Sequence, residues 1–413
     1  MRKVVITGLG AVCPIGNTAE EAWENCKNGV SGVGPITQFD ASEFLVQIAA
    51  EVKKFDPTLY MDKSEVRRRD LFEQFGTAAA KQALAQSGFA ITEANAARLG
   101  LLVSSSVGGL ATIEENALIV KEKGPRRASP FTITMIMPNG ASGMVGIDIG
   151  ARGPALSVAS ACASGADSIG MAWHLIRAGV MDAALAGCAD HSICPIGVAS
   201  FDRIGAMSRE NADYSLTPAP FDANRTGLVM GHGAGVLMLE AEDTAKARGA
   251  VILAELAGYA ATSDANHITA PREDGAGSAS AMVQALEAAG LNTTDVDYIN
   301  AHGTATPLND AAEAVAIRVA LGEDLARRVP VSSTKSMTGH MMGATGAVEA
   351  VFGVLALRDQ VAPPNIHYTT PDPAIGLNIV ANTAREMALN VVMSNAFGFG
   401  GHNAVLVLRK YTG

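Results

Sequence analysis

Aromatic and charged side chains are both scarce in this 413-residue sequence, and each shortage excludes a class of protein. Aromatic residues make up 5% and charged residues 17%, whereas 48% are hydrophobic. So few charges indicate that much of the chain is buried and that part of its surface contacts another subunit. The formal net charge of −10 argues against a nucleic-acid-binding protein, because phosphate groups would be repelled overall.

Long apolar runs are absent as well. No segment approaches the roughly 20 uninterrupted apolar residues of a membrane-spanning helix, so no membrane association is expected. The first residues, MRKVVITGLGAVCPIG, are interpreted as a buried strand that runs into a turn at Gly8 and Gly10, and not as a signal peptide. Because Cys13 stands where a dinucleotide-binding loop needs its third glycine, no such loop is expected.

Cysteine is too rare and too irregularly spaced to form a structural framework. The five cysteines have no paired-ligand spacing, and their odd number argues against a set of disulfides: Cys13, Cys26, Cys162, Cys188 and Cys194. We therefore expect a soluble protein of a reducing compartment, the cytoplasm, with no metal ion.

The sequence does contain a regular alternation of short apolar runs and Ala-rich stretches. The apolar runs predict strands at Val4–Thr7, Leu101–Ser104, Leu156–Ala159, Ala183–Ala186, Val236–Leu239, Ile252–Leu256, Tyr298–Asn300, Val329–Ser332 and Val391–Ser394. The Ala-rich stretches predict helices at Leu71–Ser87, Ala166–Ala178, Ser278–Ala289, Leu308–Ala320 and Ala347–Leu357. This alternation favours an α/β fold with largely parallel strands. A charged segment before Gly249 suggests a junction between two halves, residues 1–249 and 250–413.

The segment SVASACASGADSIG is the strongest local candidate for chemistry. A predicted strand leads to Ser160, and Cys162 lies where a helix begins. A helix N-terminus favours the thiolate form, and small neighbours let a substrate carbonyl come close. The alternative, taken on this segment alone, is that Cys162 is merely a small buried hydrophobic residue.

Two further strand ends carry reactive side chains. His302 follows a strand in YINAHGTATP, and Lys335 and His340 follow another in VSSTKSMTGHMMG. In open α/β sheets, ligands bind beyond the carboxyl ends of parallel strands. We therefore expect Cys162, His302, Lys335 and His340 to meet at one edge of the sheet.

At this point the sequence resembles a known family along nearly its whole length. The motifs SACASG, PFDANRTGLVMGHGAG, NAHGTATPLNDAAE, SSTKSMTGHMMGATGAVE and NAFGFGGHN are similar to those of β-ketoacyl-[acyl-carrier-protein] synthases of the elongating type, close to synthase II, in the thiolase superfamily. The resemblance implies a thiolase-like five-layered αβαβα fold built from two related halves, the first carrying the nucleophile and the second the two histidines. It also implies a homodimer.

The resemblance implies specific catalytic roles. Cys162 would carry the acyl chain as a thioester, and His302 and His340 would complete a Cys-His-His triad for decarboxylative condensation with malonyl-carrier protein. Lys335 would belong to a buried charge pair near His302. Phe399 would gate the cysteine, and its N–H would share an oxyanion hole with that of Cys162.

Substrate-binding residues follow from the same resemblance. Thr304 and Thr306 match hydroxyls that hold the pantetheine arm, and Glu349 is the partner of Lys335. Val107 and residues Ile133–Met137 would line the acyl pocket at the dimer interface. No cofactor is implied, because 4′-phosphopantetheine arrives on the carrier protein.

Acidic carrier proteins need a basic docking surface on an enzyme that is itself acidic. Two clusters in this sequence match the family's docking positions. The first is Lys63, Arg67, Arg68 and Arg69, and the second is Lys121, Lys123, Arg126 and Arg127. The alternative for either cluster is a solvated helix face.

The sequence also departs from the family pattern. Ala305 replaces the commonest Gly of the HGTGT loop, His232 replaces the usual Glu of the GEGAG turn, and Ser104–Ser106 stand in a stretch that is generally richer in Gly. The presence of His340 argues against starter-type synthases, and that of Cys162 against a non-catalytic chain-length partner. A discrete polyketide or specialised-lipid ketosynthase remains the alternative function.

Overall fold

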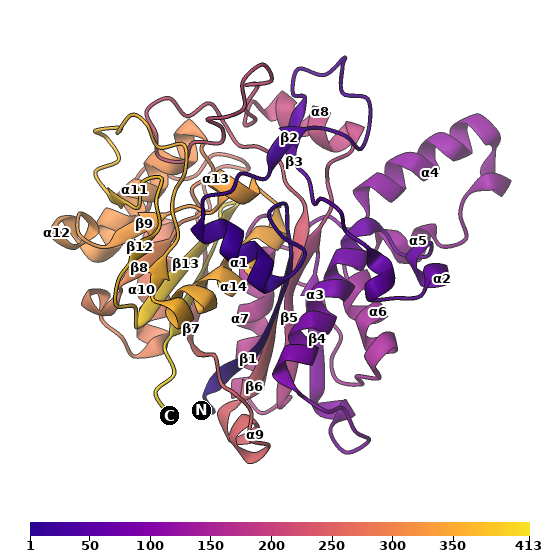
Figure 1. The fold of residues 1–413 in the computed structure, drawn as a ribbon, viewed down its shortest axis with the longest axis horizontal. Helices are drawn as coiled ribbons and strands as arrows, with labels where there is room; N and C mark the ends of the chain where they lie inside the picture. The colour runs from indigo at the N-terminus through magenta and orange to yellow at the C-terminus, as the bar shows by residue number, and fades with distance from the viewer.

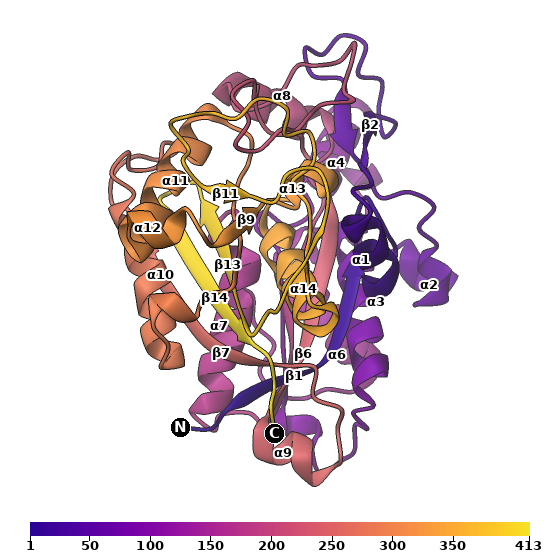
Figure 2. The ribbon, with the colours of Figure 1, turned by 60° about the vertical axis from the view of Figure 1, so that its left-hand side comes forward.

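A mixed ten-stranded sheet, bent into two layers, organises the chain. In the computed structural model, which describes residues Met1–Gly413, the strand order is β11-β9-β8-β13-β14-β7-β1-β6-β5-β4. The two layers join where Val5 and Ile6 of β1 pair with Glu255 and Ala254 of β7. Figures 1 and 2 show the layers on either side of two central helices, α7 and α14.

The elements of the first part of the chain are β1 (Val4–Val12), α1 (Ala19–Lys27), β2 (Val33–Pro35), β3 (Ile48–Ala50), η1 (Pro57–Leu59), α2 (Lys63–Val66), α3 (Leu71–Ser87), η2 (Ala96–Arg98), β4 (Leu99–Ser104), α4 (Leu110–Lys123), η3 (Pro125–Arg127), α5 (Thr132–Ile136), α6 (Gly140–Ile149), α7 (Ser164–Arg177), β5 (Ala183–Asp190), α8 (Pro195–Ile204), β6 (Gly233–Ala241) and α9 (Glu242–Ala247). Those of the second part are β7 (Ala254–Ser263), α10 (Ala276–Ala289), η4 (Thr293–Asp295), β8 (Tyr298–Asn300), α11 (Pro307–Leu321), α12 (Glu323–Ala326), β9 (Pro330–Ser332), α13 (Lys335–Thr338), α14 (Gly343–Asp359), β10 (Val361–Ala362), β11 (Asn378–Ile379), β12 (Arg385–Glu386), β13 (Val391–Gly398) and β14 (His402–Arg409).

Five layers result from this arrangement. Helices α3 and α6 cover the outer face of one sheet layer, and α10 and α11 cover the outer face of the other. Helices α7 and α14 lie between the sheet layers and contact each other. The predicted thiolate-favouring position of Cys162 therefore lies at the start of a central helix, where the surrounding layers exclude water.

The two halves repeat one pairing scheme. In the first half, β1 is antiparallel to β6, β6 is antiparallel to β5, and β5 is parallel to β4. In the second half, β7 is antiparallel to β14, β14 is antiparallel to β13, and β13 is parallel to β8. The fold is thus the thiolase-like α/β fold of two related halves that the sequence predicts.

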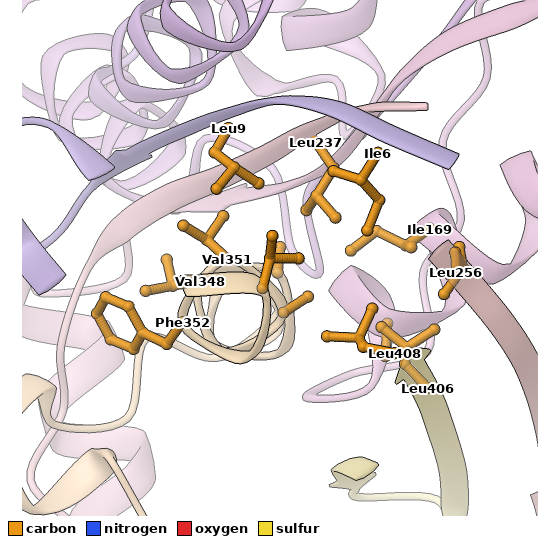
Figure 3. Packing of buried hydrophobic residues seen from close by; sticks show 14 of the residues in the cluster. Ile6, Leu9, Ile169, Leu237, Leu256, Val348, Val351, Phe352, Leu406 and Leu408 are labelled. Atoms are coloured by element: carbon orange, nitrogen blue, oxygen red, sulfur yellow. The ribbon is translucent and has the colours of Figure 1, made fainter. Parts of the chain in front are cut away.

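The largest apolar cluster fills the space around the central helices. It comprises 49 buried residues, and α14 contributes to it along its whole length. Figure 3 shows Val348, Val351 and Phe352 of α14 between side chains of both sheet layers. Since burying an aliphatic or aromatic side chain contributes about 1.5–3 kcal/mol, this cluster fixes the central helices firmly in place.

The prediction of largely parallel strands is wrong. The sheet contains five antiparallel pairings and four parallel ones. In each half, the first strand pairs with the last strand of that half. Local periodicity in the sequence does not predict a pairing between strands so far apart in the chain. The strands that precede the reactive residues of the second half, β8, β9 and β13, are nevertheless parallel to one another.

One predicted strand, Leu156–Ala159, does not form. The segment runs beside β4, the last strand of the sheet, through a single bridge between Ala155 and Leu101. Its next contact is made by a side chain, since the Val158 N–H donates to Ser104 Oγ at 2.9 Å. Without a partner on its outer side, the segment stays extended but irregular.

The turn predicted at Gly8 and Gly10 is also wrong, because β1 continues to Val12. Both glycines face α3 at very short range. A Cβ at Gly8 would lie 2.0 Å from the Ala83 carbonyl oxygen, and one at Gly10 would lie 1.8 Å from that of Ala79. The glycines therefore serve close packing of helix on strand.

The five predicted helices are confirmed as α3, α7, α10, α11 and α14, with ends that shift by four residues or fewer. None of the helices combines the length and apolar character that crossing a bilayer requires.

Candidate active site

The turn that carries Cys162 has a constrained backbone. Ala161 has a φ of +50°, a region that side chains other than glycine rarely occupy. Two serines brace the turn: the Ser160 N–H donates to Ser164 Oγ at 2.9 Å, and that hydroxyl donates to the Ala161 carbonyl at 2.7 Å. Asp167 accepts a hydrogen bond from Ser160 Oγ and another from the Tyr259 hydroxyl. Cys162 is thereby held just before α7.

All five cysteines are buried and free. Burial raises the pKa of Cys162 to about 11, while Lys335 and the backbone N–H groups of Phe399 and Cys162 oppose that rise. The pKa values of Cys13 and Cys194 are raised to about 12 by burial, and those of Cys26 and Cys188 also rise well above their usual range. Among the five thiols, Cys162 is the one that lies in a cavity with two histidines and has a nearby cation, Lys335, that opposes the rise in its pKa.

One cavity of about 290 Å³ brings together six of the residues that the sequence singles out. They are Cys162, His302, Thr304, Thr306, His340 and Phe399. Residues that the sequence reasoning did not select complete its wall, among them Phe201, Asp264 and Pro271. A single cavity with a thiol and two imidazoles can hold a thioester next to two hydrogen-bond donors.

His302 lies two residues after β8, on a loop that α11 holds in place. Glu313 of α11 accepts the backbone N–H groups of His302 and Gly303 at 2.8 and 2.7 Å. Burial, together with Lys335 and His340, lowers the pKa of His302 well below its usual range. The imidazole is therefore neutral at neutral pH.

His340 lies between α13 and α14, and its ring is nearly perpendicular to that of His302. The ring centroids are 5.3 Å apart, with an angle of 84° between the planes. His340 Nδ1 lies 3.1 Å from the Thr345 hydroxyl in the first turn of α14. Burial and Lys335 lower the pKa of His340 well below its usual range as well.

Lys335 and Glu349 form an ion pair behind the cavity. Their side chains are each 1% exposed, and Nζ lies 2.8 Å from Oε1. Burial raises the pKa of Glu349 to about 7, although Lys335 opposes the rise. Neither residue lines the cavity, so this pair acts on the histidines through its charge.

Phe399 follows β13 and is half-buried at the mouth of the cavity. Its ring is stacked with that of Phe201, at a centroid distance of 6.2 Å. Gly400 and Gly401 after it have φ values of +87° and +73°, which favour glycine. A Cβ on Gly398 would lie 2.9 Å from the Cys162 nitrogen. Glycines on both sides thus bring the Phe399 backbone against the nucleophile.

The structure does not bring Val107 into this cavity. Val107 is 46% exposed and Ile133 is 67% exposed, and neither lines the cavity. Both belong to an apolar surface around α4 to α6 that also includes Ile113, Leu118, Phe131 and Ile147.

Seven of the eight basic residues of the predicted docking surface are exposed. The prediction is wrong for Arg69, which is buried and forms an ion pair with Asp148 at 2.6 Å. Lys63 opens α2, Arg67 and Arg68 follow it, and Arg126 and Arg127 lie in η3. The Arg68 guanidinium lies 5.3 Å from the centroid of the Phe131 ring. Phe131 follows the second cluster closely in the chain. The two clusters therefore lie on neighbouring parts of one face (Figure 1).

His232 lies outside the cavity, in the first half. It is fully buried, its Nε2 accepts the Val52 N–H at 2.7 Å, and its ring packs 5.2 Å from that of Phe75. No group of three or more His, Cys, Asp or Glu side chains is arranged to hold a metal ion.

Glu313 and Thr345 are positioning residues that the sequence reasoning missed. Glu313 is a buried acid within an otherwise Ala-rich helix, which is a signal that could have found it. Thr345 gives no such signal, since its role depends on how the turn after His340 folds.

Comparisons with known proteins agree with this geometry. The profile for "Beta-ketoacyl synthase, N-terminal domain" matches residues 1–245, and that for "Beta-ketoacyl synthase, C-terminal domain" matches residues 253–369. The chain is 45% identical over 410 residues to the 3-oxoacyl-[acyl-carrier-protein] synthase 2 of Staphylococcus aureus (strain COL), with 99% of both chains covered. It is also 45% identical, over 409 residues, to that of Vibrio harveyi, again with 99% of both covered.

Solved structures give the same result. A β-ketoacyl synthase from Burkholderia phymatum STM815 superposes with a TM-score of 0.93 at 35% identity, and the ishigamide ketosynthase/chain length factor with 0.92 at 35%. The type II polyketide complex AntDE:AntF, a ketosynthase with its acyl-carrier protein, superposes with 0.91 at 32%. All three comparisons cover the whole of both chains. The chain thus belongs to the β-ketoacyl synthase family.

Proposed function

We propose that this chain is a 3-oxoacyl-[acyl-carrier-protein] synthase that elongates fatty acyl chains by decarboxylative condensation. The observation that carries the proposal is the single cavity lined by Cys162, His302 and His340. The names of the relatives that cover nearly the whole chain support the same reaction.

In the first step Cys162 attacks the thioester carbonyl of an acyl chain on its carrier. The acyl group moves to the cysteine sulfur, and the pantetheine thiol leaves. The backbone N–H groups of Phe399 and Cys162, which face the sulfur, stabilise the oxyanion that forms. The start of α7 favours the same negative charge.

In the second step malonyl-carrier protein loses carbon dioxide, and its enolate attacks the acyl-cysteine. Two neutral imidazoles with N–H groups directed at the enolate oxygen stabilise it without a formal positive charge. The Thr345 hydroxyl lies 3.1 Å from His340 Nδ1. With that hydroxyl as the donor, His340 carries its proton on Nε2, which is the tautomer that the proposal requires. Collapse of the tetrahedral intermediate releases the Cys162 thiolate and the elongated 3-oxoacyl product.

Thr304 and Thr306 line the same cavity and offer hydroxyls to the pantetheine arm. The reaction needs no resident cofactor, because this arm is covalently attached to the carrier protein. The charges of the Lys335–Glu349 pair set the electrostatic potential at His302 and His340.

We also propose a homodimer in which a second copy covers the apolar face around Val107 and Ile133. The two buried residues of α4 are the polar Thr112 and Asn116, so its apolar side chains face outward without a partner. Exposed apolar patches of this kind mark interfaces. Sedimentation equilibrium checks the proposal, and a monomer at micromolar concentration contradicts it.

The basic face around Arg68 and Arg127 is proposed as the docking surface for the acidic carrier. The double charge reversal R68E/R127E should raise the KM for malonyl-carrier protein and leave kcat nearly unchanged. The reason is that it weakens the association of the carrier with the enzyme but does not change the catalytic groups. The matched control is R327E, an exposed arginine on α12's C-terminal end, on the opposite side of the molecule. An unchanged KM in the double variant would contradict the docking assignment.

A second candidate is a discrete polyketide ketosynthase, which the likeness to the ketosynthase of a type II polyketide complex supports. Both candidates share the chemistry at Cys162 and differ in the acyl chain. We further propose a cytoplasmic enzyme, whose two halves, residues 1–249 and 250–413, carry the nucleophile and the histidines.

Mass spectrometry of the intact protein after incubation with a panel of acyl-carrier proteins tests the function. We expect a mass gain of one acyl group on Cys162, with straight saturated chains for a fatty-acid enzyme and oxygenated chains for a polyketide enzyme. No acylation with any carrier would contradict both candidates.

A further inference from the structure

Asp190, the last residue of β5, carries a buried carboxylate that the proposed chemistry does not use. The residue is 1% exposed. Its Oδ1 accepts Ser105 Oγ at 2.5 Å and the Ser106 N–H at 2.9 Å. Its Oδ2 accepts Ser106 Oγ at 2.8 Å and the Ala344 N–H at 3.3 Å. One side chain therefore joins the ends of β4 and β5 to the start of α14.

The start of α14 is also where His340 is held. Ala344 donates to Asp190, and the next residue, Thr345, places its hydroxyl 3.1 Å from His340 Nδ1. Met342, just before the helix, has a φ of +51°, which a residue with a side chain seldom adopts. This strained turn needs an external contact to keep its shape, and Asp190 supplies one.

Asp190 also lies close to the nucleophile turn. A Cβ on Gly343 would be 2.9 Å from Asp190 Oδ2 and 2.9 Å from Ser164 Cβ. Only one glycine therefore separates the carboxylate from the first residue of α7. The negative charge raises the pKa of Cys162, and Lys335 lowers it. The other titratable groups that line the cavity with the sulfur are His302, His340, Asp264 and Glu313, and both imidazoles are neutral.

We propose that Asp190 is a positioning residue for His340, because its carboxylate fixes the first turn of α14, from which Thr345 orients the imidazole. The inference deepens the proposed function and rests on it. The serines at 105 and 106, which stand where the family is richer in glycine, supply three of the four hydrogen bonds that N–H and O–H groups donate to this carboxylate. Cys188 Sγ, 3.8 Å from Oδ2, is a fifth and weaker donor.

A carboxylate suits this place better than an amide. All of these partners are donors, and a carboxylate only accepts. The N-terminus of the 17-residue helix α14 also favours a negative charge. Asn at this position would turn an NH₂ group toward Ser106 Oγ or the Ala344 N–H and leave one of them unsatisfied.

The test compares D190N with the wild type in two assays. The first is decarboxylation of malonyl-carrier protein, which depends on His340. The second is alkylation of Cys162 by iodoacetamide as a function of pH, in which the thiolate displaces iodide. We expect D190N to decarboxylate on the order of 100-fold more slowly, the cost of a misplaced group. Its alkylation profile should move to lower pH, because an anion near the sulfur is lost.

If Asp190 only stabilised the fold, D190N would lower both the rate of decarboxylation and the rate of Cys162 alkylation. The matched control is D222N, since Asp222 is an equally buried carboxylate that accepts the backbone N–H groups of Thr369 and Thr370. D222N should keep the wild-type alkylation profile.

Decarboxylation by D190N within twofold of wild type would overturn the proposal. If D190N does not fold, S106A serves instead, because it keeps the charge and removes one hydrogen bond. We expect S106A to lose about 2- to 10-fold in decarboxylation, and a wild-type rate would overturn the proposal equally. Failure of Cys162 to accept any acyl group would count against the proposed function, whereas the alkylation profile reports on Asp190 regardless.

Discussion

The two central helices occupy equivalent places in the two halves, yet their first turns are built differently. Helix α7 begins two residues after Cys162, and no side chain caps its N-terminus. Helix α14 begins three residues after His340, and the Asp190 carboxylate already occupies its first turn. The first turn of α7 contains its own acid, Asp167, which accepts hydrogen bonds from Ser160 Oγ and the Tyr259 hydroxyl. The acid at the first turn of α14, Asp190, comes instead from the end of β5 and accepts a backbone N–H of that turn. One fold thus supplies an attacking group and a donor from equivalent positions.

Replacing Cys162 tests the α7 side of this comparison most severely. C162A should lower condensation by more than about 10⁴-fold, because no other group accepts the acyl chain. Decarboxylation of malonyl-carrier protein should persist, since it depends on the α14 side. Product formation and release of carbon dioxide measure the two activities.

The control for C162A is C194A, because Cys194 is also a buried cysteine that precedes a helix, α8. C194A should condense at the wild-type rate. If C162A condensed at a rate comparable to that of C194A, the start of α7 would not supply the attacking group.

Replacing His340 tests the α14 side. H340A should lower decarboxylation on the order of 100- to 1,000-fold, the usual effect of losing one preorganised donor. Acyl transfer to Cys162 should continue, and intact-protein mass spectrometry follows it. H174A, an exposed histidine on α7, is the control and should be active. If H340A lost acyl transfer and decarboxylation to the same extent, the α7 side and the α14 side would not serve separate steps of the reaction.

The ion pair of Lys335 with Glu349 sharpens the comparison, since it lies beside α14. K335M leaves Glu349 buried without a partner and should lower the free energy of unfolding by about 3–5 kcal/mol. Because burial raises the pKa of Glu349, protonation relieves the unpaired charge. Without Lys335, which lowers this pKa, the pKa of Glu349 rises above the value of about 7 that it has in the pair. The loss should therefore be small near the pKa of an unfolded Glu, about 4.3, and grow as the pH rises above it.

Denaturant unfolding at pH 5.5 and 8 measures this difference. The double variant K335M/E349L should recover most of the stability, because two apolar side chains replace the pair. A K335M deficit that does not change with pH would show that Glu349 is not its source.

The smallest expected effect concerns Thr345. T345V removes the hydroxyl beside His340 Nδ1 while keeping the shape, and a hydrogen bond contributes about 0.5–1.5 kcal/mol. Decarboxylation should fall about 2- to 12-fold, and T345S should restore it. A T345V enzyme as active as wild type would remove Thr345 from the link to His340 and, with it, the route by which Asp190 is proposed to act.

The sequence was sufficient for those parts of the fold and site that local patterns determine. The helix Leu71–Ser87 was predicted to the residue, because a buried apolar face lies between Asp70, which forms a capping box, and Gly88 with its positive φ. His302 and His340 were predicted to meet because both follow parallel strands, and they do.

What local patterns missed depends on long-range contact. Leu156–Ala159 has the composition of a strand but no neighbour on one side. The antiparallel return of β6 onto β1 joins residues more than 200 positions apart. In the sequence, Asp190 can be identified only as the end of a strand. Its contacts with Ser105 and Ala344 form only when the chain has folded.

The glycines of β1 have a further mechanical consequence. At Gly8 and Gly10 the backbone of α3 rests directly on the strand, so main-chain atoms set the closest approach of these two layers at these two positions. Side-chain rearrangements elsewhere in α3 do not change that spacing. The helix also cannot slide along β1 without lifting away from it. The outer layer of the first half is therefore a rigid support for the strands that lead to the cavity.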